Sequence, residues 1–204
     1  MAVPAVDAAQ CEMISRVFWE ISRKQCLIGF ERFFLQNEAH DRIREKIYSK
    51  VIGHLLVAII VQGAGFRLTL KAHPDLTPLK NSCAKICGIP VSDVDEHQIR
   101  DCVREYLNIV GGGIQAELSR MDLESRLSLP VATRGFDELF FGKPSTPIQH
   151  ETAWDLIWPD GSIPISALLE LIDPQEVTAL LNYKPGDPGE DLFELLTRDQ
   201  QGNV

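Results

Sequence analysis

Three polar side chains with the spacing of a single helical face lie within DCVREYLNIVGGGIQAEL, residues 101–118. At roughly 100° per residue, Asp101, Glu105 and Asn108 fall within about 60° of one another, and Gly112 continues their line. Carboxylate and carboxamide oxygens accept hydrogen bonds from a partner molecule, and a glycine beside them leaves the helix backbone bare. The pattern predicts a helix face presented to another surface, although such a spacing is also typical of a merely solvated face.

The opposite side of the same stretch is apolar. Its members are Ile99, Cys102, Val103, Leu107, Val110, Ile114 and Leu118. An apolar stripe at helical spacing predicts burial against a core, so we expect a helix from about Val94. The run Gly111 to Gly113 is unusual, because each glycine inside a helix costs about 0.5–1 kcal/mol relative to alanine. It is compatible with close approach by another surface or with a break in the helix.

Composition limits the class of protein. A chain of 204 residues can bury a substantial core without disulfides. The net charge of −9 argues against nucleic acid or an anionic membrane as partner. The apolar run Leu55 to Val61 is too short to span a bilayer, and MAVPAVDAAQ does not resemble a secretory signal. Five cysteines, an odd number, fit a reducing compartment. We therefore expect a cytoplasmic protein.

The elements that must position the polar face begin with a helix. Apolar residues at helical spacing predict it from Val6 to about Arg23, with Gly29 as a plausible end. Residues 30–35 are compatible with a strand or a helix. Asn37 to Glu45 is compatible with a linker or a short helix.

Two hairpins are expected. The apolar runs Ile47 to Val61 and Phe66 to Ala72 flank a short glycine-bearing turn. The runs Ile148 to Trp158 and Ser162 to Ile172 flank Pro159-Asp160-Gly161, and a DG turn is a strong hairpin signal. A short strand is also predicted at Leu127 to Thr133.

Helices complete the pattern. Leu79 to Cys87 is predicted as a helix closed by Gly88, and Glu176 to Leu181 is weakly helical. Residues 183–191 are typical of a loop, and a last short helix is expected near Leu192 to Leu196. The order of elements predicts an α+β fold, with helices packed on a largely antiparallel sheet.

The polar line on the predicted helix and the residues after it resemble a known family. Asp101-x3-Glu105-x2-Asn108, followed by glycines on an apolar helix, resembles the Asp/Ser-x3-Glu-x2-Asn signature of the CheC/CheX/FliY chemotaxis phosphatases. LSLPVATRG, residues 127–135, is similar to the S-x-P-x-x-x-x-G strand and turn that follows this helix in CheX-like members. The first hairpin and the helix after it also stand in the family's order. The resemblance covers roughly Val51 to Ile172.

The resemblance implies dephosphorylation of the phospho-aspartate of a CheY-like response regulator. Asn108 would hold the attacking water, and Glu105 would pair with a lysine of the regulator. Asp101 would be a supporting carboxylate that favours the helix dipole, and Gly112 would give room for docking. An alternative is a non-catalytic CheX-like interaction or sensory domain in two-component signalling, which binds a partner through the same face.

The family also suggests the wider organisation. Mg²⁺ is expected on the regulator, so no cofactor or metal of the chain's own is expected, and a homodimer is expected. Residues 1–173 would form the CheX-like phosphatase domain, with 30–50 as an insertion candidate. Residues 174–204 would be a C-terminal extension.

Other stretches with chemical potential are weaker. A second copy of the signature, as in CheC-type members, would fall at Ala8-x3-Glu12-x2-Ser15, which lacks the amide, so a single site is expected. Ser166-x3-Glu170-x2-Asp173 falls on a predicted strand, where the period is wrong. Cys83 and Cys87 share a helical face but are more typical of buried small hydrophobes. The five histidines are scattered without HxH or HExxH spacing, which gives a zinc or triad enzyme little support.

Overall fold

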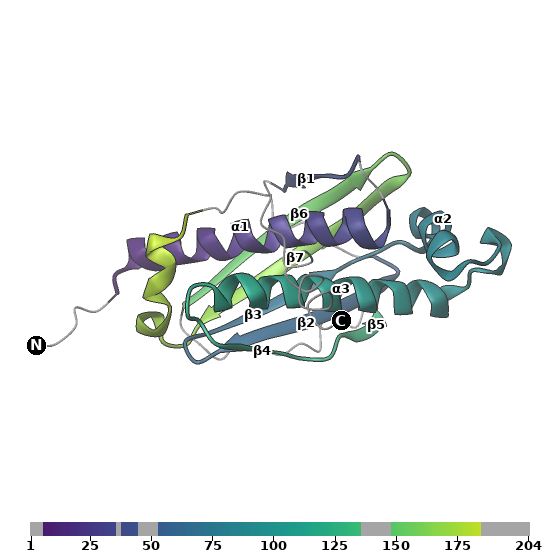
Figure 1. Ribbon diagram of the computed structural model, residues 1–204. Coiled ribbons are helices and arrows are strands. Elements are labelled where there is room, and N and C mark those ends of the chain that lie inside the picture. Colours follow the sequence, from purple (N-terminus) through teal and green to yellow (C-terminus); the bar gives the residue numbers. More distant parts are fainter. Residues whose placement is uncertain (1–5, 36–37, 45–52, 136–147, 185–204) are drawn as a thin grey trace, which may run out of the picture.

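The computed structural model of the chain describes residues 6–35, 38–44, 53–135 and 148–184. Two long helices, α1 and α3, lie side by side over one face of an antiparallel sheet (Figure 1). The elements are α1 (Ala8–Phe33), β1 (His40–Ile43), β2 (Leu55–Gly63), β3 (Phe66–Ala72), α2 (Leu76–Cys87), η1 (Val91–Asp93), α3 (Glu96–Ser119), β4 (Ser125–Leu127), β5 (Val131–Arg134), β6 (Ile148–Trp158), β7 (Gly161–Leu171) and η3 (Pro174–Asn182). None of the helices among these residues is long and apolar enough to cross a membrane.

The sheet is built from the two predicted hairpins. The order of its strands is β1-β6-β7-β3-β2-β4, and β5 also pairs with β2 beyond the break that follows β4. Every strand pair in the described residues is antiparallel. This confirms the predicted α+β class with helices on a largely antiparallel sheet.

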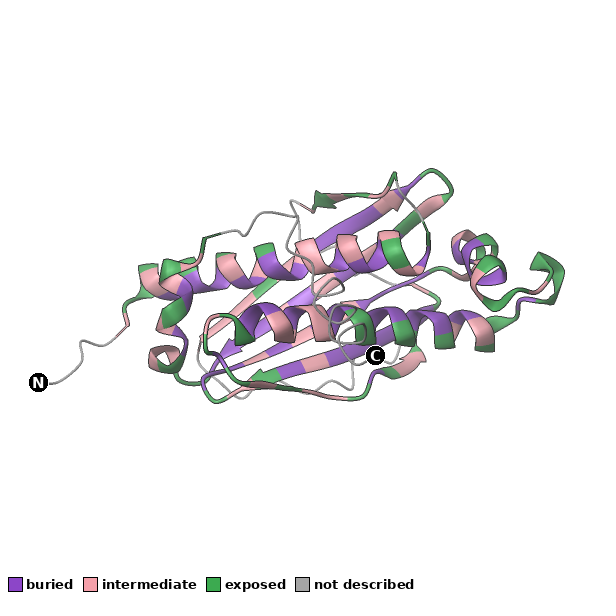
Figure 2. Cartoon of the chain, in the orientation of Figure 1, coloured by how far each residue is buried: buried purple, intermediate pink, exposed green. Residues whose placement is uncertain are grey.

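The core lies between the helices and the sheet. Along β3, Phe66, Leu68, Leu70 and Ala72 are buried while the residues between them are half-buried, as a strand with one covered face requires. The predicted apolar stripe of α3 is buried throughout. Figure 2 shows exposed residues along the outer sides of both long helices and buried residues in the sheet beneath them. The phase of α3 is therefore the one the sequence predicts.

The two long helices run antiparallel and are locked together by polar and apolar contacts. The Tyr106 hydroxyl, near the middle of α3, donates a hydrogen bond to the Cys26 carbonyl oxygen, 3.0 Å away. Two residues earlier on α1, Lys24 Nζ lies 3.5 Å from Oε1 of Glu117, near the C-terminal end of α3. Full burial raises the pKa of the Tyr106 phenol well above its usual value, so the hydroxyl stays neutral and keeps donating.

Two predictions in the first part of the chain are wrong. Helix α1 continues through Gly29 to Phe33, because Gly29 lies against α3: a Cβ there would be 3.1 Å from Cγ2 of Val110. This glycine permits close packing and does not end the helix. Residues 40–43 form β1, neither a linker nor a helix, because β6 supplies the partner for their backbone groups.

The later predictions hold with shifted boundaries. Helix α2 begins at Leu76, earlier than predicted, and ends at Gly88, which has a left-handed φ of 66°. The strand predicted at Leu127 to Thr133 is divided into β4 and β5, both paired with β2. The weak helix after Pro174 is the 3-10 helix η3. The start of the first hairpin strand before residue 53, most of the predicted loop at 183–191 and the last helix at 192–196 lie outside the described residues.

Candidate functional site

The candidate site begins with the cap that sets the phase of α3. Asp95 Oδ1 accepts hydrogen bonds from the backbone N–H groups of His97 (2.7 Å) and Gln98 (3.0 Å). The Gln98 side chain in turn accepts from the Asp95 backbone N–H at 2.9 Å. This capping box satisfies N–H groups that the first helical turn would otherwise leave unpaired. It fixes where the helix starts and so which residues point outward.

The predicted polar residues share one groove. Asp101, Glu105 and Asn108 are exposed on the outer face of α3. They line a groove of about 300 Å³ together with Arg104, Leu129 and Pro130. One wall is polar and belongs to α3, and the other is apolar and belongs to the turn between β4 and β5.

Within this groove, Glu105 and Asn108 are the side chains without internal partners. Neither forms a hydrogen bond or ion pair with the described part of the chain, whereas the other carboxylates of α3 do. Asp101 lies 3.1 Å from His97 Nδ1 and 3.7 Å from Arg104 Nη1. Glu96 pairs with Arg100, and Glu117 with Lys24 and Arg120. A partner can therefore engage Glu105 and Asn108 without breaking a hydrogen bond or ion pair to any described residue.

The expectation that Asp101 favours the dipole of α3 is wrong. Because α3 begins at Glu96, Asp101 lies beyond the first turn, where the helix dipole has little effect. Its contacts instead place it between His97 and Arg104 at the edge of the groove.

The three consecutive glycines have three different surroundings, and the helix continues unbroken through them. Gly111 faces the sheet, where a Cβ would lie 2.5 Å from Cδ1 of Leu127 and 3.0 Å from Cδ1 of Ile59. Gly113 faces α1, where a Cβ would collide with the Gln25 side chain. Gly112 has no described atom within 4 Å of its Cβ position. Of the three, Gly112 is the one whose missing side chain is not required by packing against a described neighbour.

The apolar wall is the turn at residues 128–130, and the sequence did not indicate that this turn would line the groove. Ser128 donates its backbone N–H to the Ile60 carbonyl at 2.9 Å, and its hydroxyl accepts from the Ile60 N–H at 3.0 Å. These bonds hold Leu129 outward with 82% of its surface exposed. Pro130 was a visible signal for a break in the strand, since proline cannot donate to a ladder. Which helix the turn would face was not visible.

Comparison with known proteins gives the fold. No protein-family model and no curated protein matches the chain. Among solved structures, CheX from Vibrio vulnificus has a TM-score of 0.59 at 18% identity and covers 75% of this chain and 99% of its own. A chemotactic CheC-like protein from Shewanella oneidensis has a TM-score of 0.61 at 17% identity, and the match covers 76% of this chain and 98% of that protein. A chain of the CheX-CheY-BeF3-Mg²⁺ complex from Borrelia burgdorferi has a TM-score of 0.58 at 15% identity, and the match covers 76% of this chain and 98% of that one. The chain has the CheC/CheX-like fold.

In this CheC/CheX-like fold, α1 carries no matching face. Glu12 is exposed and pairs with Arg16, with 2.6 Å between Oε1 and Nη2, while Ser15 is buried and donates to the Cys11 carbonyl oxygen at 2.8 Å. The signature positions on α1 therefore point to different sides. Ser166 and Glu170, on β7, contact His73 and Arg67 respectively, as expected of a chance match on a strand.

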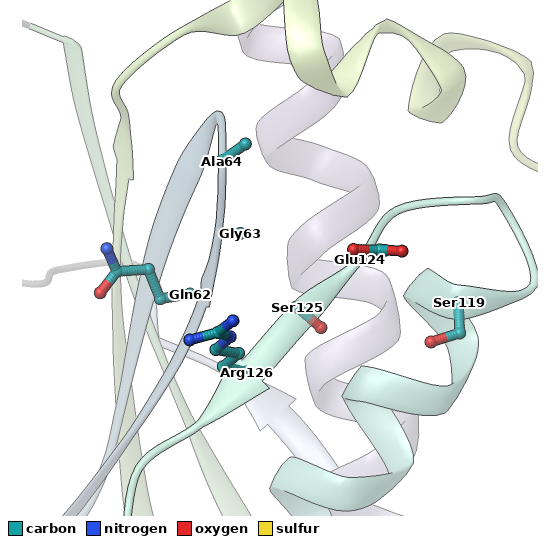
Figure 3. A pocket seen from close by; sticks show the side chains of 7 residues that line it. All are labelled: Gln62, Gly63, Ala64, Ser119, Glu124, Ser125 and Arg126. Carbon is teal, nitrogen blue, oxygen red and sulfur yellow. The ribbon is translucent and has the colours of Figure 1, made fainter.

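A larger groove lies at the far end of α3. It has a volume of about 600 Å³ and is lined by Gln62, Gly63, Ala64, Ser119, Glu124, Ser125 and Arg126 (Figure 3). Ser119 is about 16 Å from Asn108 along the helix axis, at about 1.5 Å per residue. None of the predicted site residues reaches it.

The cysteines of α2 and α3 meet, which the sequence did not indicate. Cys87 is exposed and not buried as predicted, and its sulfur lies 3.9 Å from that of Cys102. Cys83 is buried beside them and, with burial, raises the pKa of the Cys102 thiol. Within the described residues no group of histidines, cysteines and carboxylates could hold a metal ion.

Proposed function

We propose that the protein removes the phosphoryl group from the phospho-aspartate of a CheY-like response regulator. The observation that carries this proposal is the pair Glu105 and Asn108, exposed and without a hydrogen-bond or ion-pair partner among the described residues, one helical turn apart on a groove of a CheC/CheX-like fold. A solved neighbour of this fold is a CheX protein in complex with CheY and Mg²⁺.

The chemistry needs little from the phosphatase. An aspartyl phosphate is a mixed anhydride, so water that attacks phosphorus forms a new P–O bond as the bond to the aspartate oxygen breaks. The products are inorganic phosphate and the free carboxylate. Mg²⁺ held by the regulator neutralises charge on the phosphoryl oxygens, and the chain supplies no cofactor of its own. The missing contribution is a water held in line, which is catalysis by positioning.

Asn108 is suited to hold that water. Its carboxamide oxygen accepts a hydrogen bond from the water, and its neutrality adds no repulsion against the anionic phosphoryl group. Glu105, one turn earlier, pairs with a lysine of the regulator and keeps the two proteins in register. Asp101 orients its neighbours, and the bare backbone at Gly112 lets the regulator approach α3.

The test is the decay of phosphorylated CheY-like regulators from the same genome. We expect the wild-type protein to accelerate decay, Asn108→Ala to lose at least about 100-fold of that acceleration, and Glu105→Ala to weaken binding about tenfold. Glu12→Ala and Asn81→Ala are matched controls, because both residues are exposed and lie outside the groove.

Two outcomes would contradict the proposal. Acceleration that survives Asn108→Ala would mean that another group positions the water. Binding of a regulator without acceleration would favour the alternative, a CheX-like interaction or sensory domain that uses the same face.

A further inference from the structure

The apolar wall of the candidate groove is an unusual surface feature. Leu129 is the most exposed of the large hydrophobic side chains in the described residues. A single exposed leucine needs no explanation by itself. This one lines the same groove as Glu105 and Asn108, and Pro130, which is itself buried, lines the groove beside it.

The turn that carries Leu129 is held in place before any partner arrives. Both strands that flank it, β4 and β5, pair with β2. Between them the Ser128 hydroxyl accepts from the Ile60 N–H and also donates to the Leu129 carbonyl oxygen at 3.1 Å. Pro130 restricts the backbone further. A residue fixed in this way loses little conformational freedom on binding, so more of the contact free energy appears as affinity.

The position of Leu129 determines which surface of a bound regulator it contacts. A regulator whose phospho-aspartate reaches Asn108 must enter the groove, and Leu129 and Pro130 form the other wall of that groove. The surface of the regulator beside its phosphorylation site therefore faces Leu129 on one side and Arg104 and Glu105 on the other. An apolar patch beside polar groups of both signs is the complementary surface.

We infer that Leu129 is a docking residue that recognises an apolar patch next to the phosphorylation site of the receiver domain. This inference rests on the proposed function. Leu129 sets the affinity for the regulator and helps to select which regulator binds, while Asn108 sets the rate of hydrolysis in the complex. A leucine buried at an interface contributes about a tenfold to hundredfold change in affinity, from the transfer of its apolar surface out of water.

The experiment separates affinity from turnover. We expect Leu129→Ala to raise KM for the phosphorylated regulator about tenfold with kcat unchanged, and Leu129→Asp to raise it further. The Kd of the non-hydrolysing Asn108→Ala protein should rise by the same factor when Leu129→Ala is added. Leu35→Ala is the matched control, since Leu35 is 66% exposed at the end of α1 and does not line the groove.

The outcomes distinguish this inference from the proposed function. Dephosphorylation by the wild type with unchanged KM and Kd in Leu129→Ala would overturn the inference alone. A fall in kcat at unchanged KM would also overturn it, because Leu129 would then act on positioning. Binding without dephosphorylation would overturn the proposed reaction, and the effect of Leu129→Ala on Kd would still decide the docking role. Absence of binding to every regulator would overturn both.

Discussion

Asn108 and Glu105 are exposed and have no polar partner in the described part of the chain, whereas Asp101 on the same face lies between His97 and Arg104. Under the proposed function, this difference distinguishes Asn108 and Glu105, which would contact the regulator, from Asp101, which would orient its neighbours. We expect Asp101→Ala to lower phosphatase activity by about fivefold or less, since an exposed pair of this kind contributes about 0.2–1 kcal/mol. Steady-state kinetics would show it, and a loss as large as that of Asn108→Ala would place Asp101 in the reaction itself.

Gly111 and Gly112 offer a test within a single helical turn. Gly112→Ala should raise the free energy of unfolding by about 0.5–1 kcal/mol, because alanine favours the helix and meets no neighbour. It should also weaken regulator binding if the bare backbone serves docking. Gly111→Ala should instead lose about 1–3 kcal/mol, because its methyl group would displace Leu127 in packed surroundings.

Urea unfolding of the two glycine variants gives these free energies. Equal destabilisation by both would contradict the different surroundings of the two residues. A Gly112→Ala protein that binds the regulator as tightly as wild type would remove Gly112 from the docking surface.

The capping box at Asp95 fixes the start of α3 and so the residues that lie on its outer face. Asp95→Ala removes the acceptor for the N–H groups of His97 and Gln98, so we expect a loss of about 1 kcal/mol in the free energy of unfolding. Asp93→Ala is the control, since Asp93 is exposed two residues earlier and does not cap α3. Chemical denaturation would measure both, and an equal loss in the control would contradict the role of the cap.

The elements predicted correctly are those whose signals are local. The stripe from Ile99 to Leu118 gave the phase of α3, and glycine-bearing turns gave both hairpins. The two wrong element predictions both depend on a neighbour distant in the sequence. Gly29 looked like the end of a helix because its contact with Val110 comes from α3. Residues 40–43 are a strand because β6 lies beside them.

The residues of the candidate site also fall into those that local spacing predicts and those that depend on distant contacts. The polar line on α3 follows from helical spacing, so it could be predicted. Leu129 and Arg104 could not be assigned to the groove, because the approach of the β4–β5 turn to α3 depends on the pairing of both strands with β2. The proximity of Cys87 and Cys102 likewise depends on how α2 packs on α3.

For the whole molecule, the contact between α1 and α3 predicts a loss of stability in alkali. Burial raises the pKa of Cys26 to about 12 from 9.0, and it also raises that of Tyr106. Above about pH 9 the unfolded chain releases protons that the folded chain keeps, so the free energy of unfolding should fall as pH rises from about 9 to 12. Below pH 9 this contribution is fully present.

Urea unfolding between pH 7 and 11 would check this prediction, with Cys26→Ala and Tyr106→Phe as the informative variants. Each variant should flatten part of the decline. A decline that is unchanged in both would assign the alkaline effect to other groups.

The arrangement of strands bears on the predicted homodimer. The long apolar strands β2, β3, β6 and β7 are interior to the sheet, and its edges are the short β1 on one side and the β4–β5 line, interrupted at Pro130, on the other. Short, charged or interrupted edges are typical of sheets that resist further pairing. The described edges therefore give little support to dimerisation by strand pairing. The homodimer stays a prediction, and sedimentation at several protein concentrations would test it.

The mismatch on α1 has a consequence for stoichiometry. With Glu12 and Ser15 directed to different sides, the described residues of each chain offer one complete face, on α3, beside the β4–β5 turn. A titration with a non-hydrolysable phosphorylated regulator should saturate at one equivalent per chain. Saturation at two equivalents per chain would contradict the single face on α3.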